Sequence, residues 1–363
     1  YYFDSPRHRR VSRIEAPNGQ ALSLIYDTTN KLVAIRDPYG REITLTYDAT
    51  GYLTQVTDPN VTPERTVYYA HDAAGNLISV VDALGHTTTY SYDGDHRLIG
   101  VRDPKGNSVQ IAYNTDGMVA SLSTPLSART FAYDEKMHKT TVVDMVSGSE
   151  SQRTIYHYDE RGRLTELERN DGLSRTVAWD ENDNPVSVTD EAGRTTHYTF
   201  DDRSNVTSIT DPLDREVTMT YHPTFGDMTS FEDPLGHVTA WEYDSHGNLV
   251  SRTEPGNRLT TFEYDDLGWH MTSMTDPLSR TTEFGYDQLG NNTVITDATG
   301  AVMTFTYDAI GRMLSVTDDN GHSTAYDYDV AGRVTSVTDP LSRATSFAYD
   351  ASGNPVQVTD AAG

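Results

Sequence analysis

A repeat of about 21 residues runs along almost the whole chain and limits its fold more than any other feature. The last segment, TDPLSRATSFAYDASGNPVQVTDAAG, closely matches TDPLSRTTEFGYDQLGNNTVITDATG at residues 275–300. Most copies hold an aromatic residue, an Asp directly after it and a Gly three positions further on. Repetition at a fixed period is typical of arrays in which one supersecondary unit contacts mainly its neighbours. We therefore interpret residues 1–363 as one array of about sixteen repeats.

The aromatic–Asp–Gly signature is interpreted as structural, with no catalytic residue in it. Asp bonds its side chain to amides two or three residues further on, and Gly tolerates the positive φ that follows a type I turn. The signature therefore predicts a turn in every repeat, with positive φ at Gly311, Gly332 and Gly353. In the clearest copies it comprises Tyr26, Asp27, Tyr47, Asp48, Gly51, Tyr243, Asp244, Gly247, Tyr286, Asp287, Gly290, Tyr307, Asp308, Gly311, Tyr328, Asp329, Gly332, Tyr349, Asp350 and Gly353.

Each repeat contains a second turn signal, as in Asp-Pro-Leu-Gly at residues 233–236. Asp first, Pro second and Gly fourth is the preference of a type I turn. The runs between the turns are too short for helices and rich in β-branched and aromatic residues, so each repeat is predicted to form two strands. We expect strands near residues 32–37, 42–47, 333–338 and 343–349. Two insertions, near 60–65 and 135–152, are expected to lie at turns, where extra residues are well tolerated.

The two strands of a repeat differ in their apolar pattern. One alternates strictly, so that Met303, Phe305 and Tyr307 share one face of the sheet. The other places its apolar residues three positions apart, as at Val334 and Val337. This spacing puts the two side chains on opposite faces unless a β-bulge lies between them. The sequence leaves both alternatives open.

Consecutive hairpins predict an all-β chain, one continuous antiparallel ribbon. About thirty strands at ~4.8 Å each would span on the order of 150 Å. Twist accumulates between neighbouring strands, so a sheet of this length must coil. The sequence opens within a strand signal and stops within a turn signal. We expect it to be a segment of a longer polypeptide, because an uncapped array leaves an unpaired edge.

Composition narrows the range of functions. The formal net charge of −26 disfavours binding to nucleic acid or to an anionic membrane surface. The absence of cysteine excludes disulfides and thiolate chemistry. No apolar run is long enough for a membrane helix, so we expect no membrane insertion by this segment. Only 36% of the residues are hydrophobic, but 23 Tyr residues and frequent Thr and Val favour a wide, shallow sheet over disorder.

The Asp, His and aromatic residues of the repeats could form a metal, catalytic or sugar-binding site, or could have a structural role. A calcium ion needs about six oxygen ligands at one point, whereas the turn Asp residues occur once per turn without EF-hand spacing. The histidines lack the paired spacing of zinc ligands, and no nucleophile elbow or phosphate-binding Gly loop is present. Tyr and Trp can stack on sugars, but their fixed register favours packing between repeats. We expect no cofactor, no metal and no enzyme activity.

The segment YDVAGRVTSVTDPLSRATSFAYD at residues 328–350 resembles the YD repeat of the Rhs family, and similar copies cover nearly the whole chain. The resemblance implies an antiparallel hairpin ribbon coiled into a hollow shell, the Rhs cocoon. It further implies a function. Rhs proteins are large polymorphic toxins, many delivered by type VI secretion, whose shell encloses a variable C-terminal toxin domain. Insecticidal toxin complexes and animal teneurins carry related shells, and the near-identical repeats favour the bacterial toxins.

On this resemblance we expect a shell segment of a secreted toxin whose own C-terminal toxin domain is the enclosed partner. A secretion spike protein and a chaperone are implied as partners of N-terminal regions absent from this sequence. The alternative is an extracellular YD-repeat adhesin or carbohydrate-binding protein at the cell surface. The residues that follow position 363 would separate these two hypotheses.

Overall fold

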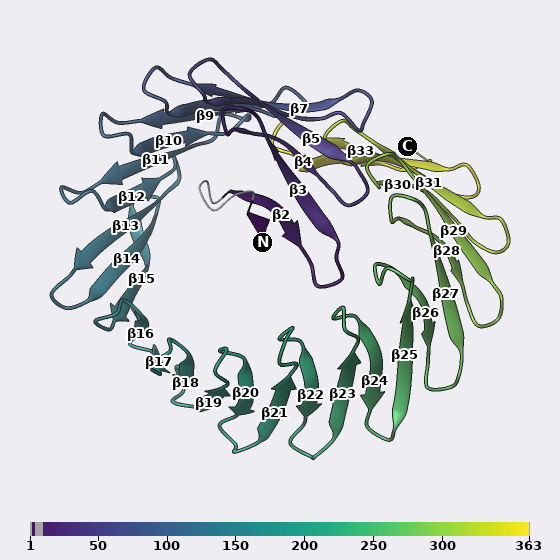
Figure 1. Cartoon of the computed structure of the whole chain (residues 1–363). Helices are drawn as coiled ribbons and strands as arrows, with labels where there is room; N and C mark the ends of the chain where they lie inside the picture. The colour runs from purple at the N-terminus through teal and green to yellow at the C-terminus, as the bar shows by residue number, and fades with distance from the viewer. Residues whose placement is uncertain (1, 4–9, 363) are drawn as a thin grey trace.

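The chain folds as a single antiparallel sheet. The computed structural model describes residues 2–3 and 10–362, which form 34 strands and no helix. Each strand pairs with the strand before it and the strand after it in the sequence, from β1–β2 to β33–β34. Figure 1 shows the strands following one another around a ring. The predicted all-β hairpin ribbon and its coiling are confirmed.

The strands of the first half are β1 (Tyr2–Phe3), β2 (Val11–Glu15), β3 (Ala21–Tyr26), β4 (Leu32–Arg36), β5 (Glu42–Tyr47), β6 (Leu53–Asp58), β7 (Arg65–His71), β8 (Leu77–Val81), β9 (Thr87–Tyr92), β10 (Leu98–Arg102), β11 (Ser108–Tyr113), β12 (Val119–Ser123), β13 (Ser127–Asp134), β14 (Lys139–Val146), β15 (Ser149–Tyr158), β16 (Leu164–Arg169) and β17 (Ser174–Trp179). Those of the second half are β18 (Pro185–Thr189), β19 (Thr195–Phe200), β20 (Val206–Thr210), β21 (Glu216–Tyr221), β22 (Met228–Glu232), β23 (Val238–Tyr243), β24 (Leu249–Glu254), β25 (Arg258–Tyr264), β26 (Met271–Thr275), β27 (Thr281–Tyr286), β28 (Asn292–Thr296), β29 (Val302–Tyr307), β30 (Met313–Thr317), β31 (Ser323–Tyr328), β32 (Val334–Thr338), β33 (Ala344–Tyr349) and β34 (Pro355–Thr359).

Four strands were predicted individually, and β4, β5, β32 and β33 confirm them. The insertion near 60–65 lies in the turn between β6 and β7, as expected. The insertion near 135–152 was expected at a turn, and this prediction is wrong. Most of it lengthens β14 and β15 to 8 and 10 residues. Its Thr-Thr-Val-Val run at 140–143 is a strand former, and it extends the ladder instead of looping out.

A β-bulge resolves the apolar spacing that the sequence left open. In β29 and β30, Thr306 pairs with Ser315 and Tyr307 with Met313, so Leu314 is the extra residue. Phe305 then pairs with Val316. Directly paired residues share a face, so the bulge brings Met313 and Val316 to the face of the aromatic residues. Register shifts at corresponding positions recur along the sheet, for example in β31–β32 and β33–β34.

The sheet has no central core. Among the described residues, the only buried hydrophobic side chains are Ala34 and Met219, and no large side chain is fully buried. The face opposite the aromatic residues carries many hydroxyls, and pairs such as Thr306–Ser315 and Thr220–Ser230 lie at 2.7 and 2.6 Å. Stability therefore comes from the ladder and from cross-strand pairs spread along the ribbon.

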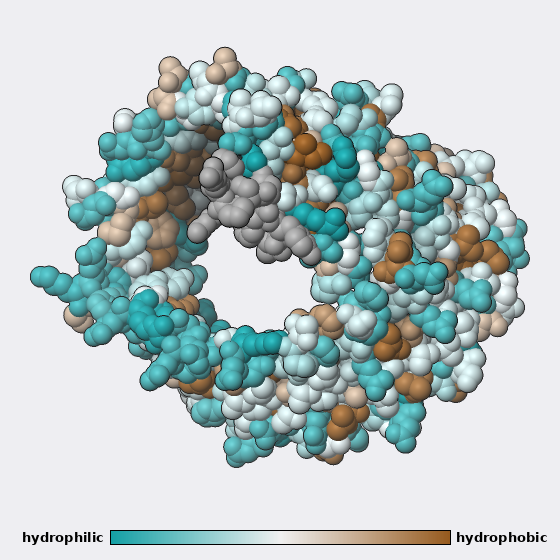
Figure 2. Space-filling model, viewed as in Figure 1, coloured by the Kyte–Doolittle hydropathy of each residue, from teal (hydrophilic) through white to brown (hydrophobic). Residues whose placement is uncertain are grey.

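The coiled sheet has two rims, because successive turns of a meander alternate between its two sides. We call the rim formed by turns such as 27–30, 48–51 and 308–311 the Tyr-Asp edge. The opposite rim, formed by turns such as 37–40, 103–106 and 233–236, is the Asp-Pro edge. Figure 2 shows that side chains leave an open centre inside the ring, and that part of the visible inner wall is hydrophobic.

Candidate functional site

The turns on both edges share one hydrogen-bond pattern, centred on an aspartate. At Asp308, Oδ1 accepts from the amides of Ile310 and Arg312 at 3.1 and 2.9 Å, and Oδ2 accepts from Arg312 Nε at 2.6 Å. The Asp308 carbonyl accepts from the Gly311 amide at 3.0 Å. At Asp339, on the Asp-Pro edge, the carboxylate likewise accepts from two amides and from Arg343 Nε. One carboxylate thus fixes the backbone of each such turn.

These hydrogen bonds favour the charged carboxylate. The Arg194 side chain and then the Arg194 amide lower the pKa of Asp190 below its ordinary value. The same two donors, from Arg280 and Arg343, lower the pKa of Asp276 and of Asp339. Among the described residues, no group of three or more His, Asp or Glu side chains is placed to hold a metal ion. The geometry is that of turn capping.

The tyrosine of each repeat signature can also donate a hydrogen bond to the backbone, a role that packing alone does not explain. Tyr328 donates its hydroxyl to the Met313 carbonyl at 2.8 Å, 15 residues earlier, at the start of the bulged strand of the preceding hairpin. A bulge disrupts the ladder locally, so an additional donor is needed there. Trp179 uses its indole Nε1 in the same way on the Leu164 carbonyl. Equivalent bonds are made by Tyr26, Tyr47, Tyr113, Tyr133, Tyr221, Tyr243, Tyr264, Tyr286 and Tyr349.

Replacing Tyr328 with phenylalanine is expected to destabilise its hairpin by about 1–2 kcal/mol, because the partly buried Met313 carbonyl loses its donor. Amide hydrogen exchange in β30–β32 measures the loss, which should stay local in an array coupled between neighbours. Tyr326→Phe is the matched control. Tyr326 lies two residues earlier on the same strand face, and its hydroxyl makes no hydrogen bond to a described residue. Equal effects of the two substitutions would contradict the assignment.

The signature glycines adopt the backbone conformation that the sequence predicts. Gly311, Gly332 and Gly353 have φ of 85°, 87° and 83°, in the left-handed region that favours glycine. Gly290 is constrained a second time, because a Cβ there would collide with the ring of Tyr39 from a distant repeat. The structure spreads the signature residues along one rim and does not gather them at a common point.

The coil brings distant repeats into contact, and we call this contact the seam. Across it, the Asp-Pro edge of residues 16–105 meets the Tyr-Asp edge of residues 244–354. Trp269 Nε1 donates to the Asn18 carbonyl at 3.0 Å, and Lys105 Nζ bonds Asp350 Oδ2 at 2.7 Å. These partners lie 251 and 245 residues apart, so one winding takes about twelve repeats.

A chain of polar side chains runs through the middle of the seam. Asp265 Oδ2 lies 2.7 Å from His270 Nδ1, and His270 Nε2 lies 2.8 Å from the Tyr39 hydroxyl. Gln20 Nε2 donates to the same hydroxyl at 2.9 Å. A carboxylate accepts only, so in the neutral imidazole Nδ1 carries the proton and Tyr39 donates to Nε2. Burial raises the pKa of Tyr39, so its hydroxyl stays protonated at neutral pH.

The repeat pattern of the sequence does not predict the seam. Five signature residues take part in it: Gly247, Gly290, Gly311 and Gly332 lie beside Pro17, Tyr39, Arg41 and Arg65, and Asp350 bonds Lys105. One signal was present. In the turn 265–270, Asp265 N bonds the carbonyl five residues on instead of four, which makes room for Trp269. An extra aromatic residue in one copy of a regular turn indicates a contact outside the repeat.

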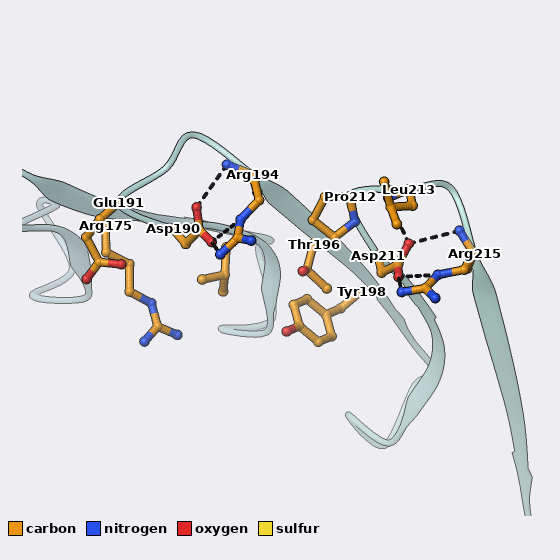
Figure 3. A pocket seen from close by; sticks show the side chains of 11 residues that line it. Arg175, Asp190, Glu191, Arg194, Thr196, Tyr198, Asp211, Pro212, Leu213 and Arg215 are labelled. Carbon is orange, nitrogen blue, oxygen red and sulfur yellow. Dashed lines mark hydrogen bonds and ion pairs between the residues drawn. The ribbon is translucent and has the colours of Figure 1, made fainter.

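A groove opens on the Asp-Pro edge between the turns that begin at Asp190 and Asp211, with a volume of about 580 Å³. Figure 3 shows Arg194 and Arg215 folded back onto these two carboxylates, with Tyr198 between the turns. The two guanidinium groups are therefore already paired. The groove repeats the turn pattern of its neighbours, and Glu191, Thr196 and Tyr198 also line it.

The coiled wall and its capped turns define a class, the β-sheet shell. The Teneurin YD-shell family model matches residues 111–299, and the RHS Repeat model matches residues 26–60, 71–108, 292–324, 307–344 and 328–363. The first match covers more than half of the chain, and the chain therefore belongs to the YD-shell family, built from RHS repeats. A search of the curated proteins gave no match. The described residues contain no helix long and apolar enough to cross a membrane.

Several solved structures share this fold. A TcdB2-TccC3 crystal structure is similar over 95% of this chain, with a TM-score of 0.68 and 12% identity. TcdB2-TccC3-Cdc42 gives a TM-score of 0.64 at 12% identity over the same share of this chain. The Photorhabdus luminescens Tc holotoxin pore gives 0.56, also at 12% identity over 95% of this chain. This chain spans only 22–23% of those chains. At this identity the likeness shows the fold alone.

Proposed function

We propose that this chain is a wall segment of a secreted Rhs polymorphic toxin and that the wall encloses a C-terminal toxin domain of the same polypeptide. The observation that carries the proposal is the open centre, which the side chains of the coiled sheet leave unfilled (Figure 2). A barrel widens as its strand number grows, and 34 strands surround far more space than their own side chains occupy. A wall of this kind is suited to containment.

The construction of the wall supports this role. Its backbone is paired from strand to strand, so it presents few unpaired groups to a cargo. Part of the inner wall is hydrophobic, which suits contact with a partly folded domain (Figure 2). Most repeats use the same turn and bulge geometry, so much of the wall presents a similar surface. One such wall serves cargos of unrelated sequence.

We further propose that the toxin is made in the bacterial cytoplasm and exported by type VI secretion, with a spike protein and a chaperone bound by regions outside this sequence. The chain contains no cysteine, so its folding needs no oxidising compartment. The match to the Teneurin YD-shell model keeps one alternative open, an extracellular adhesin of the same fold that carries no cargo.

Limited proteolysis of the full-length polypeptide that contains this segment tests containment. The C-terminal domain is expected to resist cleavage inside the intact shell and to be cut readily when it is expressed alone. The control is the same polypeptide unfolded in denaturant and diluted into the protease, in which both parts should be cut. A C-terminal domain cleaved equally fast in the shell and alone lies outside the wall, and the adhesin then replaces the toxin.

A further inference from the structure

A pocket of about 440 Å³ lies on β9, β10 and β11, a volume that is enough for a small ligand. Gly100, which is buried, lies at its centre. The side chains around Gly100 are polar and project from the face opposite the aromatic residues. None of them bonds to a described residue, although cross-strand pairs elsewhere on this face bond each other. They are Thr89, Ser91, Arg102, Ser108 and Gln110.

The pocket exists because the repeat changes at two places, and the first is Gly100. In other hairpins the residue before the signature aromatic bonds a serine across the ladder, as Thr306 bonds Ser315 at 2.7 Å. Ser91 holds the position of Thr306, but it pairs with Gly100, which has no side chain. A Cβ at Gly100 would lie 2.6 Å from Ser91 Oγ. The missing side chain therefore leaves a depression with the Ser91 hydroxyl turned toward it.

The second change lies two residues further along β10, at Arg102. Arg36 holds the same position in β4, and its Nε and Nη2 donate to Glu42 Oε2 at 2.9 and 2.6 Å. Arg102 pairs with Ser108 instead, and it makes no ion pair or hydrogen bond with a described residue. This is unusual in a chain with 54 acidic and 28 basic residues. The group that is missing opposite Arg102 is a carboxylate.

We propose that this pocket binds a sugar acid, free or as one residue of a polysaccharide. Its carboxylate lies on Arg102, and its hydroxyl groups lie on Ser91, Ser108 and Gln110. A guanidinium binds a carboxylate through charge-assisted hydrogen bonds, and hydroxyl and carboxamide groups can both donate to and accept from a sugar hydroxyl. Of the described residues that line the pocket, none is acidic. The net charge of −26 opposes an anion at long range, so we expect weak binding.

The pocket stays open although the rim beside it is covered. The neighbouring turn 103–106 belongs to the seam, where Lys105 Nζ bonds Asp350 Oδ2 and Ser352 Oγ donates to Asp103 Oδ2 at 3.4 Å. A second winding already occupies this part of the Asp-Pro edge. It adds no residue to the lining of the pocket, which lies on the face of the sheet. A ligand can therefore reach Arg102 with both windings in place.

Saturation-transfer difference NMR of the 363-residue chain with glucuronate and glucose in one sample is the test, because these sugars differ in the carboxylate. Glucuronate should bind at least about tenfold more tightly than glucose. Ser108→Glu places a carboxylate opposite Arg102, and Gly100→Ser fills the depression. Both should weaken glucuronate binding without changing the circular dichroism spectrum, Ser108→Glu by at least about tenfold. The matched control is Ser323→Glu, the same change at the same repeat position, where the paired residue is Thr317.

A trimer of galacturonate, compared with the monomer, identifies the source of the sugar acid. Tighter binding of the trimer indicates a polysaccharide, and equal binding indicates the free sugar acid. Equal signals from glucose and glucuronate, or glucuronate binding that Ser108→Glu leaves unchanged, would overturn the proposal. So would a Ser323→Glu control that loses as much binding as Ser108→Glu. None of these outcomes affects containment, which proteolysis of the full-length polypeptide tests.

Discussion

Replacing Trp269 with alanine is expected to open the seam between the two windings. The substitution removes the bond to the Asn18 carbonyl and the edge-to-face contact between Trp269 and Tyr39, whose ring centroids lie 6.2 Å apart. Truncation of a core tryptophan costs about 3–5 kcal/mol, and Trp269 is only half-buried. We expect a loss of roughly 2–3 kcal/mol once the missing hydrogen bond is included.

Two measurements report the opening. Amide exchange should accelerate in the turns 16–19 and 37–40, although these lie about 230–250 residues from the substitution. Small-angle scattering should show a larger radius of gyration, because the seam holds the coil closed. The control is Trp179→Ala, since the Trp179 indole bonds only the nearby Leu164 carbonyl. That variant should accelerate exchange in its own hairpins and leave the scattering unchanged. The same result for Trp269→Ala would mean that the seam does not hold the coil.

The sequence predicts the local architecture because each repeat carries the same turn and strand signals. Turns such as 308–311 combine an Asp cap with a Gly at positive φ, and alternating residues such as Phe305 and Tyr307 place strands between them. Two features were not decided by pattern. The spacing of Val334 and Val337 fits either a straight or a bulged strand, and only the register shows the bulge. The 135–152 insertion was misjudged, since length indicates a loop whereas its β-branched residues extend strands.

No local pattern in the sequence predicts the seam. Whether Tyr39 meets His270 or a neighbouring repeat depends on the sum of small twists over more than twenty strands, which no single repeat specifies. The sequence does contain residues that fit the contact between the two windings. Trp269 and Phe225 sit in turns that close one residue later than the others, and Phe225 lies against Gly247, which also contacts the first winding. The extra residues of these two turns therefore lie at or beside a long-range contact, whereas the repeat itself specifies the wall.

Acid should destabilise the wall through its capping aspartates. The ordinary pKa of Asp is 3.8, and hydrogen bonds lower the folded-state pKa at turns such as Asp190, Asp211 and Asp276. A group with a depressed folded pKa stabilises the fold fully above its unfolded pKa, and this contribution is lost as the pH falls through the folded value. The melting temperature should therefore stay level down to about pH 5 and then fall steeply below about pH 4.

A second electrostatic effect acts in the opposite direction. At pH 7 the net charge of −26 causes repulsion within the folded chain, and protonation relieves it until the pH reaches the pI of about 4.6, below which the chain becomes net positive. Salt separates the two effects, because it screens long-range repulsion but leaves short hydrogen bonds in place. Adding salt at pH 7 is expected to raise the melting temperature. Adding the same salt at pH 3 screens the positive net charge of the acid form, but it should not restore the part of the stability that the aspartate caps have lost.

Asn114 suggests a variant that tests the contribution of the capping aspartates alone. Asn114 occupies a capping position, and its Oδ1 accepts from the amides of Asp116 and Met118 at 3.0 and 2.9 Å. Asparagine thus preserves the amide bonds but has no proton to gain and no second acceptor for arginine. Asp190→Asn combined with Asp276→Asn should lower the melting temperature at pH 7, through the lost bonds from the two arginines, and should flatten its fall below pH 4. An acid profile parallel to that of the wild type would show that aspartates other than the turn caps control acid unfolding.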